Sequence, residues 1–397
     1  MREVKKINKL DKRNTAMDII RIVAVLFVVS IHFFLNSGYY YENNTGIEMY
    51  IMCTMRTLFT SCIPLFLLLT GYLMSKKTLC KQYYSGIVRI LLIYLMSGIA
   101  CVVYNVKFLH SELDIKKTIL SVFNFTMAPY GWYIEMYIGL FLLIPFLNIL
   151  YNAIETQKKK KILLVTIFAV SILPSLFNQF SFESQLWYNP DANVAITKLF
   201  PNWWTTLYPM AYYFIGCYVR EYGLKIKNTT ALIFLVIATV AFGAFNFFRS
   251  YNTVFEGADY VNWQGIQPFV IAVLIFVLLS RVKANKMPQW SRFVLWKISD
   301  TALGIYLVSY IFDVVAYQRL INSVPVMTER FRYFIVVVAF IFACSMGLSL
   351  VFNIILKGMS IVSEQIKGIF AVFKAEPEET EEVKKSDSNK KVSEVKK

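Results

Sequence analysis

Two residues in the first apolar stretch of the chain have types and a spacing that suit chemistry. Arg21 opens the run RIVAVLFVVSIHF, and His32 lies eleven positions later within it. A helix turns 100° per residue, so both side chains lie on one face, about 16 Å apart along the axis. Asp18 precedes Arg21 by one turn, near the same face. This helix would present a cation to an anionic ligand and, deeper along the same stripe, an acid–base group.

His32 also has a purely structural interpretation. Its ring would then bond to a neighbouring carbonyl or hydroxyl group and serve packing. A histidine within a membrane is costly without a partner or a task, which favours the functional interpretation. Arg21 alone fits an ordinary basic residue at a cytoplasmic helix end. Its functional interpretation depends on the face that it shares with His32.

Three other charged residues fall inside or at the edge of apolar segments. Glu135, Asp313 and Arg56 are all expected at roughly the depth of His32. Equal depth does not establish contact. Glu135 and Arg56 are equally able to pair with each other as structural charges.

Helices that cross a membrane must position these residues. Hydrophobic residues make up 57% of the 397-residue chain, charged residues only 17%, and the mean hydropathy is +0.52. Apolar blocks of about twenty residues are long enough to span a bilayer as helices. We predict an all-α polytopic membrane protein with about ten transmembrane helices. The expected spans are 17–36, 54–74, 87–106, 131–151, 162–178, 204–220, 231–248, 267–281, 299–318 and 334–356.

The distribution of basic residues predicts the orientation. With the N-terminus in the cytoplasm, cytoplasmic segments before the C-terminal part carry 22 Lys and Arg residues and outer loops carry 8, as the positive-inside rule requires. Both termini are then cytoplasmic. We expect three regions: a basic N-terminus (1–16), a transmembrane domain (17–356) and a charged tail (357–397). The tail should be largely disordered, from about Ala375 onward.

The net charge of +16 is therefore mainly a topology signal. The basic residues are spread over separate loops, so we predict no nucleic-acid partner, and expect contact with membrane lipids instead. The six cysteines form no CxxC pair and the chain has only two histidines. Neither a disulfide framework nor a metal site is expected.

Several segments, taken in order, resemble the acyltransferase-3 family of integral-membrane enzymes that O-acylate carbohydrates. The first is the Arg-x10-His pattern itself. The second and third are PLFLLLTGYLMSKK (64–77) and the arginine-led YSGIVRILLIY (84–94). The fourth and fifth are YGWYIEMYIGLFLLIPFLN (130–148) and KISDTALGIYLVSYIFD (297–313). The resemblance covers about residues 15–356.

The resemblance implies a donor, an acceptor and roles for particular residues. Acetyl-CoA from the cytoplasm would be the donor, with its phosphates held by Arg21 and Arg89. A sugar hydroxyl at the outer face would be the acceptor. His32 would act as base or as acyl carrier, oriented by Glu135 or Asp313. Substrate contacts are expected at the following residues: Arg56, Trp132, Tyr133, Tyr306 and Ser309.

Two departures from the family pattern concern basic residues. Ser309 stands where many members have a second histidine, and Gly86 stands where an arginine is expected before Arg89. The aromatic outer motifs LWYN (186–189) and PNWW (201–204) would either stack on sugar rings or form an interfacial belt.

A transporter or flippase for a polymer or a small solute is the main alternative, since ten helices with buried charges suit it as well. Arg21 on the face of His32 favours an enzyme with an anionic cytosolic donor. A non-enzymatic membrane scaffold would explain the tail but not the buried histidine. Richness in Lys, Ile, Asn and Tyr is typical of an AT-rich bacterial genome, so we predict a multi-pass protein of a bacterial plasma membrane. A homo-oligomer is left open.

Overall fold

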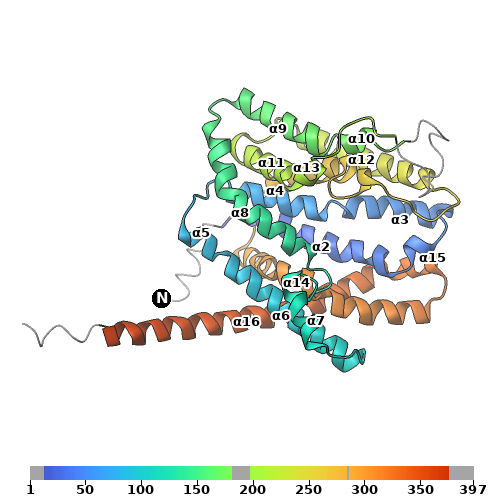
Figure 1. Ribbon diagram of the computed structural model, residues 1–397. Helices are drawn as coiled ribbons and strands as arrows, with labels where there is room; N and C mark the ends of the chain where they lie inside the picture. Colours follow the sequence, from blue (N-terminus) through green and yellow to red (C-terminus); the bar gives the residue numbers. More distant parts are fainter. Residues whose placement is uncertain (1–12, 181–196, 284–285, 375–397) are drawn as a thin grey trace, which may run out of the picture. The chain divides into compact units, whose positions relative to one another are not determined.

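The computed structural model describes residues 13–180, 197–283 and 286–374, with side chains as far as residue 360 (Figure 1). Residues 1–12 of the basic N-terminus, the LWYN motif and the tail from Ala375 lie outside these ranges. Within them the regular structure is helical, apart from two isolated β-bridges. The predicted all-α polytopic class is confirmed.

Each of the ten predicted spans contains a helix. Eight helices or joined helix pairs in the described part are long and apolar enough to cross a membrane, while α9 and α11 have 15 residues each. The main helices are α2 (Thr15–Asn36), α3 (Gly46–Phe59), α4 (Cys62–Met74), α6 (Ile87–Phe108), α8 (Trp132–Ala153), α9 (Gln157–Ser171), α11 (Tyr208–Tyr222), α12 (Asn228–Arg249), α13 (Ile266–Ser280), α14 (Gln289–Ser323) and α16 (Phe334–Lys374). The short ones are α5 (Lys81–Ser85), α7 (Ile115–Phe123), α10 (Pro174–Phe177) and α15 (Met327–Arg330).

Three predicted boundaries differ from the structure by eight residues or more, and one of them is the start of the ninth span, where α14 begins at Gln289 rather than 299. The second span begins at Gly46 rather than 54, and a break at Thr60 and Ser61 divides it into α3 and α4. The last helix continues past 356 to Lys374. Apolar residues mark only the part of a helix that lipid can surround, whereas backbone hydrogen bonds also continue through polar turns.

The chain divides into two compact units, Met1–Ser349 and Leu350–Lys397, and the residues discussed below belong to the first. There α2 packs against α4, α13 and α14, and Figure 1 shows it inside the bundle. Helix α4 approaches α11 closely because both contribute a glycine: a Cβ at Gly71 would lie 2.0 Å from the Tyr213 carbonyl oxygen, and one at Gly216 would lie 2.1 Å from that of Leu68. These approaches hold the bundle around α2.

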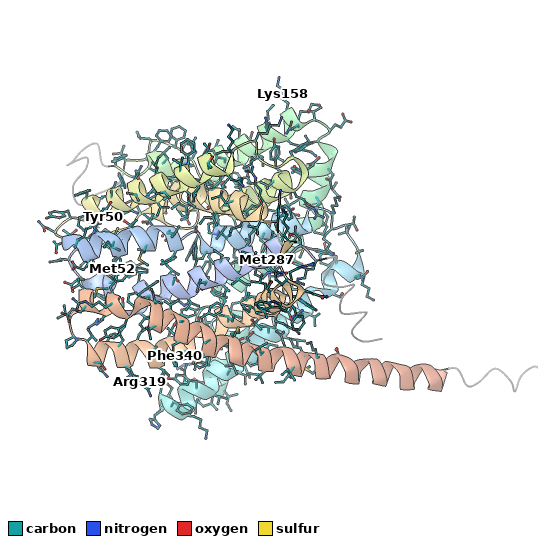
Figure 2. All side chains as sticks on the ribbon, turned by 180° about the vertical axis from the view of Figure 1, so that it is seen from behind. Tyr50, Met52, Lys158, Met287, Arg319 and Phe340 are labelled. Atoms are coloured by element: carbon teal, nitrogen blue, oxygen red, sulfur yellow. The ribbon has the colours of Figure 1, made fainter. Side chains whose placement is uncertain are left out.

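The surface of this unit suits a lipid environment. Large apolar side chains such as Phe340 are exposed on the helices, and Figure 2 shows them projecting from the ribbon. The lysines at the start of α9 differ in their exposure to solvent. Lys158 points outward, whereas Lys160 is buried and its Nζ lies 2.8 Å from Glu221. The apolar exterior and the basic helix end are typical of a membrane-spanning bundle.

Candidate active site

His32 lies deep in the bundle and faces α14. Its Nδ1 atom is 3.0 Å from Oδ2 of Asp313 and 3.4 Å from the hydroxyl of Ser309. The side chains of His32 and Asp313 are 8% and 2% exposed. A carboxylate on Nδ1 fixes the orientation of an imidazole ring and leaves Nε2 for proton transfer. Ser309, which the sequence analysis compared with a second histidine of the resembled family, thus lies against His32.

Tyr130 completes this group, although the sequence analysis did not single it out. Its ring lies over the His32 ring, with centroids 4.0 Å apart, and its hydroxyl donates to Oδ2 of Asp313 over 2.8 Å. Burial raises the pKa of Tyr130, and the charge of Asp313 raises it further. The hydroxyl therefore remains protonated and acts as a donor. Asn36 donates to the His32 carbonyl oxygen (3.0 Å) and to the Tyr130 hydroxyl (3.4 Å).

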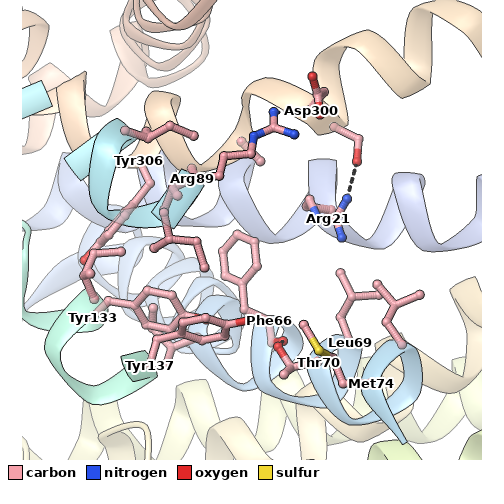
Figure 3. Close-up of a pocket in the computed structure, with 18 residues that line it drawn as sticks. Arg21, Phe66, Leu69, Thr70, Met74, Arg89, Tyr133, Tyr137, Asp300 and Tyr306 are labelled. Atoms are coloured by element: carbon pink, nitrogen blue, oxygen red, sulfur yellow. Dashed lines mark hydrogen bonds and ion pairs between the residues drawn. The ribbon is translucent and has the colours of Figure 1, made fainter. Parts of the chain in front are cut away.

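A cavity of about 420 Å³ lies between α2, α4, α6, α8 and α14. Figure 3 shows Arg21 and Arg89 towards one end and a group of tyrosines towards the other. The tyrosines are Tyr133, Tyr137 and Tyr306, and most of the remaining lining is apolar. The structure thus brings together the two arginines that the sequence analysis assigned to one ligand.

Each cavity arginine already has a carboxylate near it. Arg21 donates to the Ser299 hydroxyl over 2.9 Å, and its Nη1 is 3.8 Å from Asp18. Arg13 binds the same Asp18 through two hydrogen bonds of 2.6 and 2.7 Å. Arg89 contacts Asp300 at 3.0 Å, with 54% of the arginine side chain exposed. An exposed pair of this kind exchanges readily for a pair with a ligand phosphate.

The cavity and His32 meet at a wall of tyrosines. Tyr306 lines the cavity, and its hydroxyl donates to the backbone carbonyl of Tyr130, the residue that covers the His32 ring. Tyr133, the other predicted contact in this wall, packs edge to face with Tyr306, with centroids 5.8 Å apart. A ligand in the cavity is thus separated from His32 by the Tyr130–Tyr306 contact.

Three predicted residues lie elsewhere. Glu135 is exposed on α8, and no contact joins it to His32 or Arg56 among the residues described. Trp132 stacks on Trp263, with centroids 4.2 Å apart. Arg56 is buried in α3, ten residues past the start of that helix, where its Nε donates to the Tyr40 hydroxyl. The alternative in which Glu135 pairs with Arg56 is therefore wrong, because Arg56 bonds to Tyr40 and Glu135 is exposed.

Within the described ranges, no three His, Cys, Asp or Glu side chains are grouped closely enough to hold a metal ion.

The helical architecture and the apolar exterior define a polytopic membrane protein, and a histidine–carboxylate pair is buried inside it. A protein-family model described as an acyltransferase domain matches residues 14–352. The chain belongs to this family, acyltransferase-3, and is a membrane acyltransferase. No curated protein and no solved structure matches the chain.

Proposed function

We propose that this protein transfers an acyl group, with acetyl as the expected group, from cytoplasmic acyl-CoA to a hydroxyl of a cell-surface or lipid-linked carbohydrate. The observation that carries this proposal is the placement of the His32–Asp313 pair directly behind a cavity that contains two arginines. The membrane is taken to be a bacterial plasma membrane, with the end that carries Arg21 towards the cytoplasm.

The cavity suits the parts of an acyl-CoA in order. Arg21 and Arg89 supply guanidinium groups for phosphate, which arginine binds through paired N–H donors. The apolar lining beyond them, for example Phe66 and Ile93, suits the uncharged pantetheine arm. The thioester would then lie against Tyr133 and Tyr306. Separation of Tyr306 from Tyr130 would then allow the thioester to reach His32.

The reaction then follows from the geometry of His32. The Asp313 carboxylate accepts a hydrogen bond from the Nδ1–H group of His32. This leaves the unprotonated Nε2 atom to take the proton of the acceptor hydroxyl. The hydroxyl oxygen attacks the thioester carbonyl carbon and forms the ester bond while the carbon–sulfur bond breaks. The leaving thiolate of coenzyme A takes the proton back from the imidazolium. The Asp313 carboxylate stabilises the positive charge on the ring between these two steps.

The test is a genetic complementation with a chemical readout. Ester-linked acyl groups are quantified on surface carbohydrate from the source cell, from a strain that lacks the gene, and from that strain carrying wild-type protein or His32→Gln. We expect the deletion to lower the ester content, wild type to restore it, and His32→Gln to leave it low. Glutamine keeps hydrogen bonding but cannot take a proton, so it separates base chemistry from packing.

The amount of each protein in the membrane and its melting profile in detergent serve as controls. Ester content near the wild-type level in the His32→Gln strain would contradict the role of His32. An unchanged ester content in the deletion strain would contradict the carbohydrate acceptor.

A further inference from the structure

The buried arginines of this protein fall into two kinds, according to what satisfies their N–H groups. Arg330 donates to three backbone carbonyl groups, those of Ser37, Val324 and Pro325, over 2.6 to 2.7 Å. Arg220 and Arg281, which are only partly buried, likewise bond to backbone carbonyl oxygens. These three are structural arginines whose donors have acceptors. Arg56 and Arg249 are different.

Arg56 is 8% exposed and Arg249 is 4% exposed, yet each makes a single hydrogen bond among the residues described. Within the described part of the chain, Nη1 of Arg56 and both Nε and Nη1 of Arg249 are buried and have no hydrogen-bond partner. No carboxylate of the described chain forms an ion pair with either group. Among the described residues, neither positive charge therefore has a counter-charge, and burial of an unpaired charge is unfavourable.

Aromatic rings surround these guanidinium groups. The centre of the Arg56 guanidinium lies 4.2 Å from the Phe255 ring, and that of Arg249 lies 5.2 Å from the Tyr260 ring. Asn246, one turn before Arg249, donates to Thr57, the residue after Arg56, so the two arginines lie in one region of the bundle. Cation–π contacts partly offset the loss of hydration. They do not supply oxygen acceptors for the three unbonded nitrogen atoms.

The elements that carry the two arginines are held together firmly. A Cβ on Gly243 of α12 would lie 2.7 Å from the Cα of Thr54 on α3, so the two helices touch there. Asn246 donates to Thr57 on α3 over 2.9 Å, and exchanges two hydrogen bonds with Gln267 on α13. Arg56 and Arg249 therefore project from fixed positions rather than from mobile loops.

Two loops cover the two arginines at the end of the bundle opposite to Arg21. Tyr40, which bonds to Arg56, lies in the loop after α2, and Phe255 lies in the loop after α12. The loops join through bridges at Asn43 with Val254 and at Asn44 with Tyr251. By the positive-inside rule this end faces away from the cytoplasm. A ligand would reach the arginines from that side, by parting the two loops.

We propose that Arg56 and Arg249 form a binding site for an oxyanion, either a carboxylate or a phosphate, carried by the acyl acceptor. Guanidinium groups bind both through paired N–H donors, and the three unbonded nitrogen atoms supply these donors. The assignment of the anion to the acceptor rests on the proposed function, whereas the anion site does not. The acceptor is then an acidic or phosphate-bearing carbohydrate rather than a neutral one.

The test is the thermal melting of the purified full-length protein in detergent at constant ionic strength. The added probes are D-glucuronate, inorganic phosphate and neutral D-glucose. At about 100 times its dissociation constant, a bound anion raises the melting temperature by a few degrees. We expect glucuronate or phosphate to do so and glucose to have no effect. A shift with glucuronate alone indicates an acidic sugar, and one with phosphate alone indicates a phosphate-bearing acceptor.

The variants locate the anion. Arg56→Met and Arg249→Met should each abolish the glucuronate shift, while Arg319→Met, at an exposed arginine of α14, should retain it. Arg21→Met reports any phosphate that binds in the donor cavity instead. Arg56→Lys and Arg249→Lys keep the positive charge but lack the paired N–H donors of a guanidinium group. They should therefore show a reduced shift of the melting temperature, even where the methionine variants do not fold. The proposal is overturned if neither anion raises the melting temperature. It is also overturned if glucose acts equally, or if only Arg21→Met removes the shift. Because the readout is binding, its failure would leave the acyl-transfer proposal standing.

Discussion

Arg21 and Arg89 lie at one end of the bundle and each contacts a carboxylate, whereas Arg56 and Arg249, towards the other end, contact aromatic rings. The first pair lines an accessible cavity, and Arg89 is half-exposed. The second pair is almost fully buried beneath two joined loops. The neighbouring carboxylates fix the positions of Arg21 and Arg89 when the cavity contains only water. Arg56 and Arg249 have N–H groups without acceptors among the described residues. This pair would therefore select an anionic ligand over a neutral one.

The two regions suggest a division of tasks around His32, with a donor on one side and an acceptor on the other. Experiments can test this division, because a variant in one region should leave the function of the other region intact.

The largest effect is expected at the group between the two regions. Asp313→Asn should lower acyl transfer by about 100-fold or more, because an amide neither fixes the His32 ring nor stabilises its charged form. Glu135→Gln is the matched control, since Glu135 is exposed on α8 and should leave the rate unchanged. The measurement is the initial rate of acyl transfer in membranes with equal amounts of protein. Equal losses in both variants would remove the distinction between the two carboxylates.

A smaller effect is expected for Arg21→Met on the donor. Loss of a charge-assisted hydrogen bond to phosphate should weaken coenzyme A binding by about 10- to 100-fold. Calorimetry on the purified protein measures this affinity. Arg249→Met should bind coenzyme A as wild type does, because it lies in the other region. If both variants lose donor affinity alike, the two arginine groups do not have separate tasks.

Tyr130→Phe tests the link from the cavity wall to His32. The phenylalanine ring keeps the contact with the imidazole but removes the hydroxyl that donates to Asp313. One hydrogen bond corresponds to roughly a 2- to 10-fold lower transfer rate. Coenzyme A affinity, measured alongside, should not change. A rate equal to that of wild type would show that the hydroxyl plays no part.

The smallest effect is expected for Arg89→Met. Its pair with Asp300 is largely exposed, and exposed ion pairs contribute little, so donor affinity should fall by only about 2- to 5-fold. Added salt should reduce the difference from wild type further. A loss as large as that of Arg21→Met would mean that both arginines bind phosphate equally.

The sequence by itself determined the class of fold and the face that Arg21 and His32 share on one helix. Apolar blocks predicted where the helices lie, and counting along one helix placed Arg21 and His32 on a common face. That inference needs only helix geometry, which does not depend on neighbouring helices. The broken second span was not visible, because Thr60 and Ser61 are neither charged nor classed as helix breakers.

Only the tertiary structure decided which residues meet. Glu135 and Asp313 have similar depths in their segments, but packing turns Asp313 towards His32 and leaves Glu135 exposed. Tyr130 was missed because one tyrosine in an aromatic-rich chain carries no pattern of its own. The direction in which a helix faces its neighbours depends on contacts between segments far apart in sequence, such as those of α2 with α14. Hydropathy and spacing within one segment contain no information about those contacts.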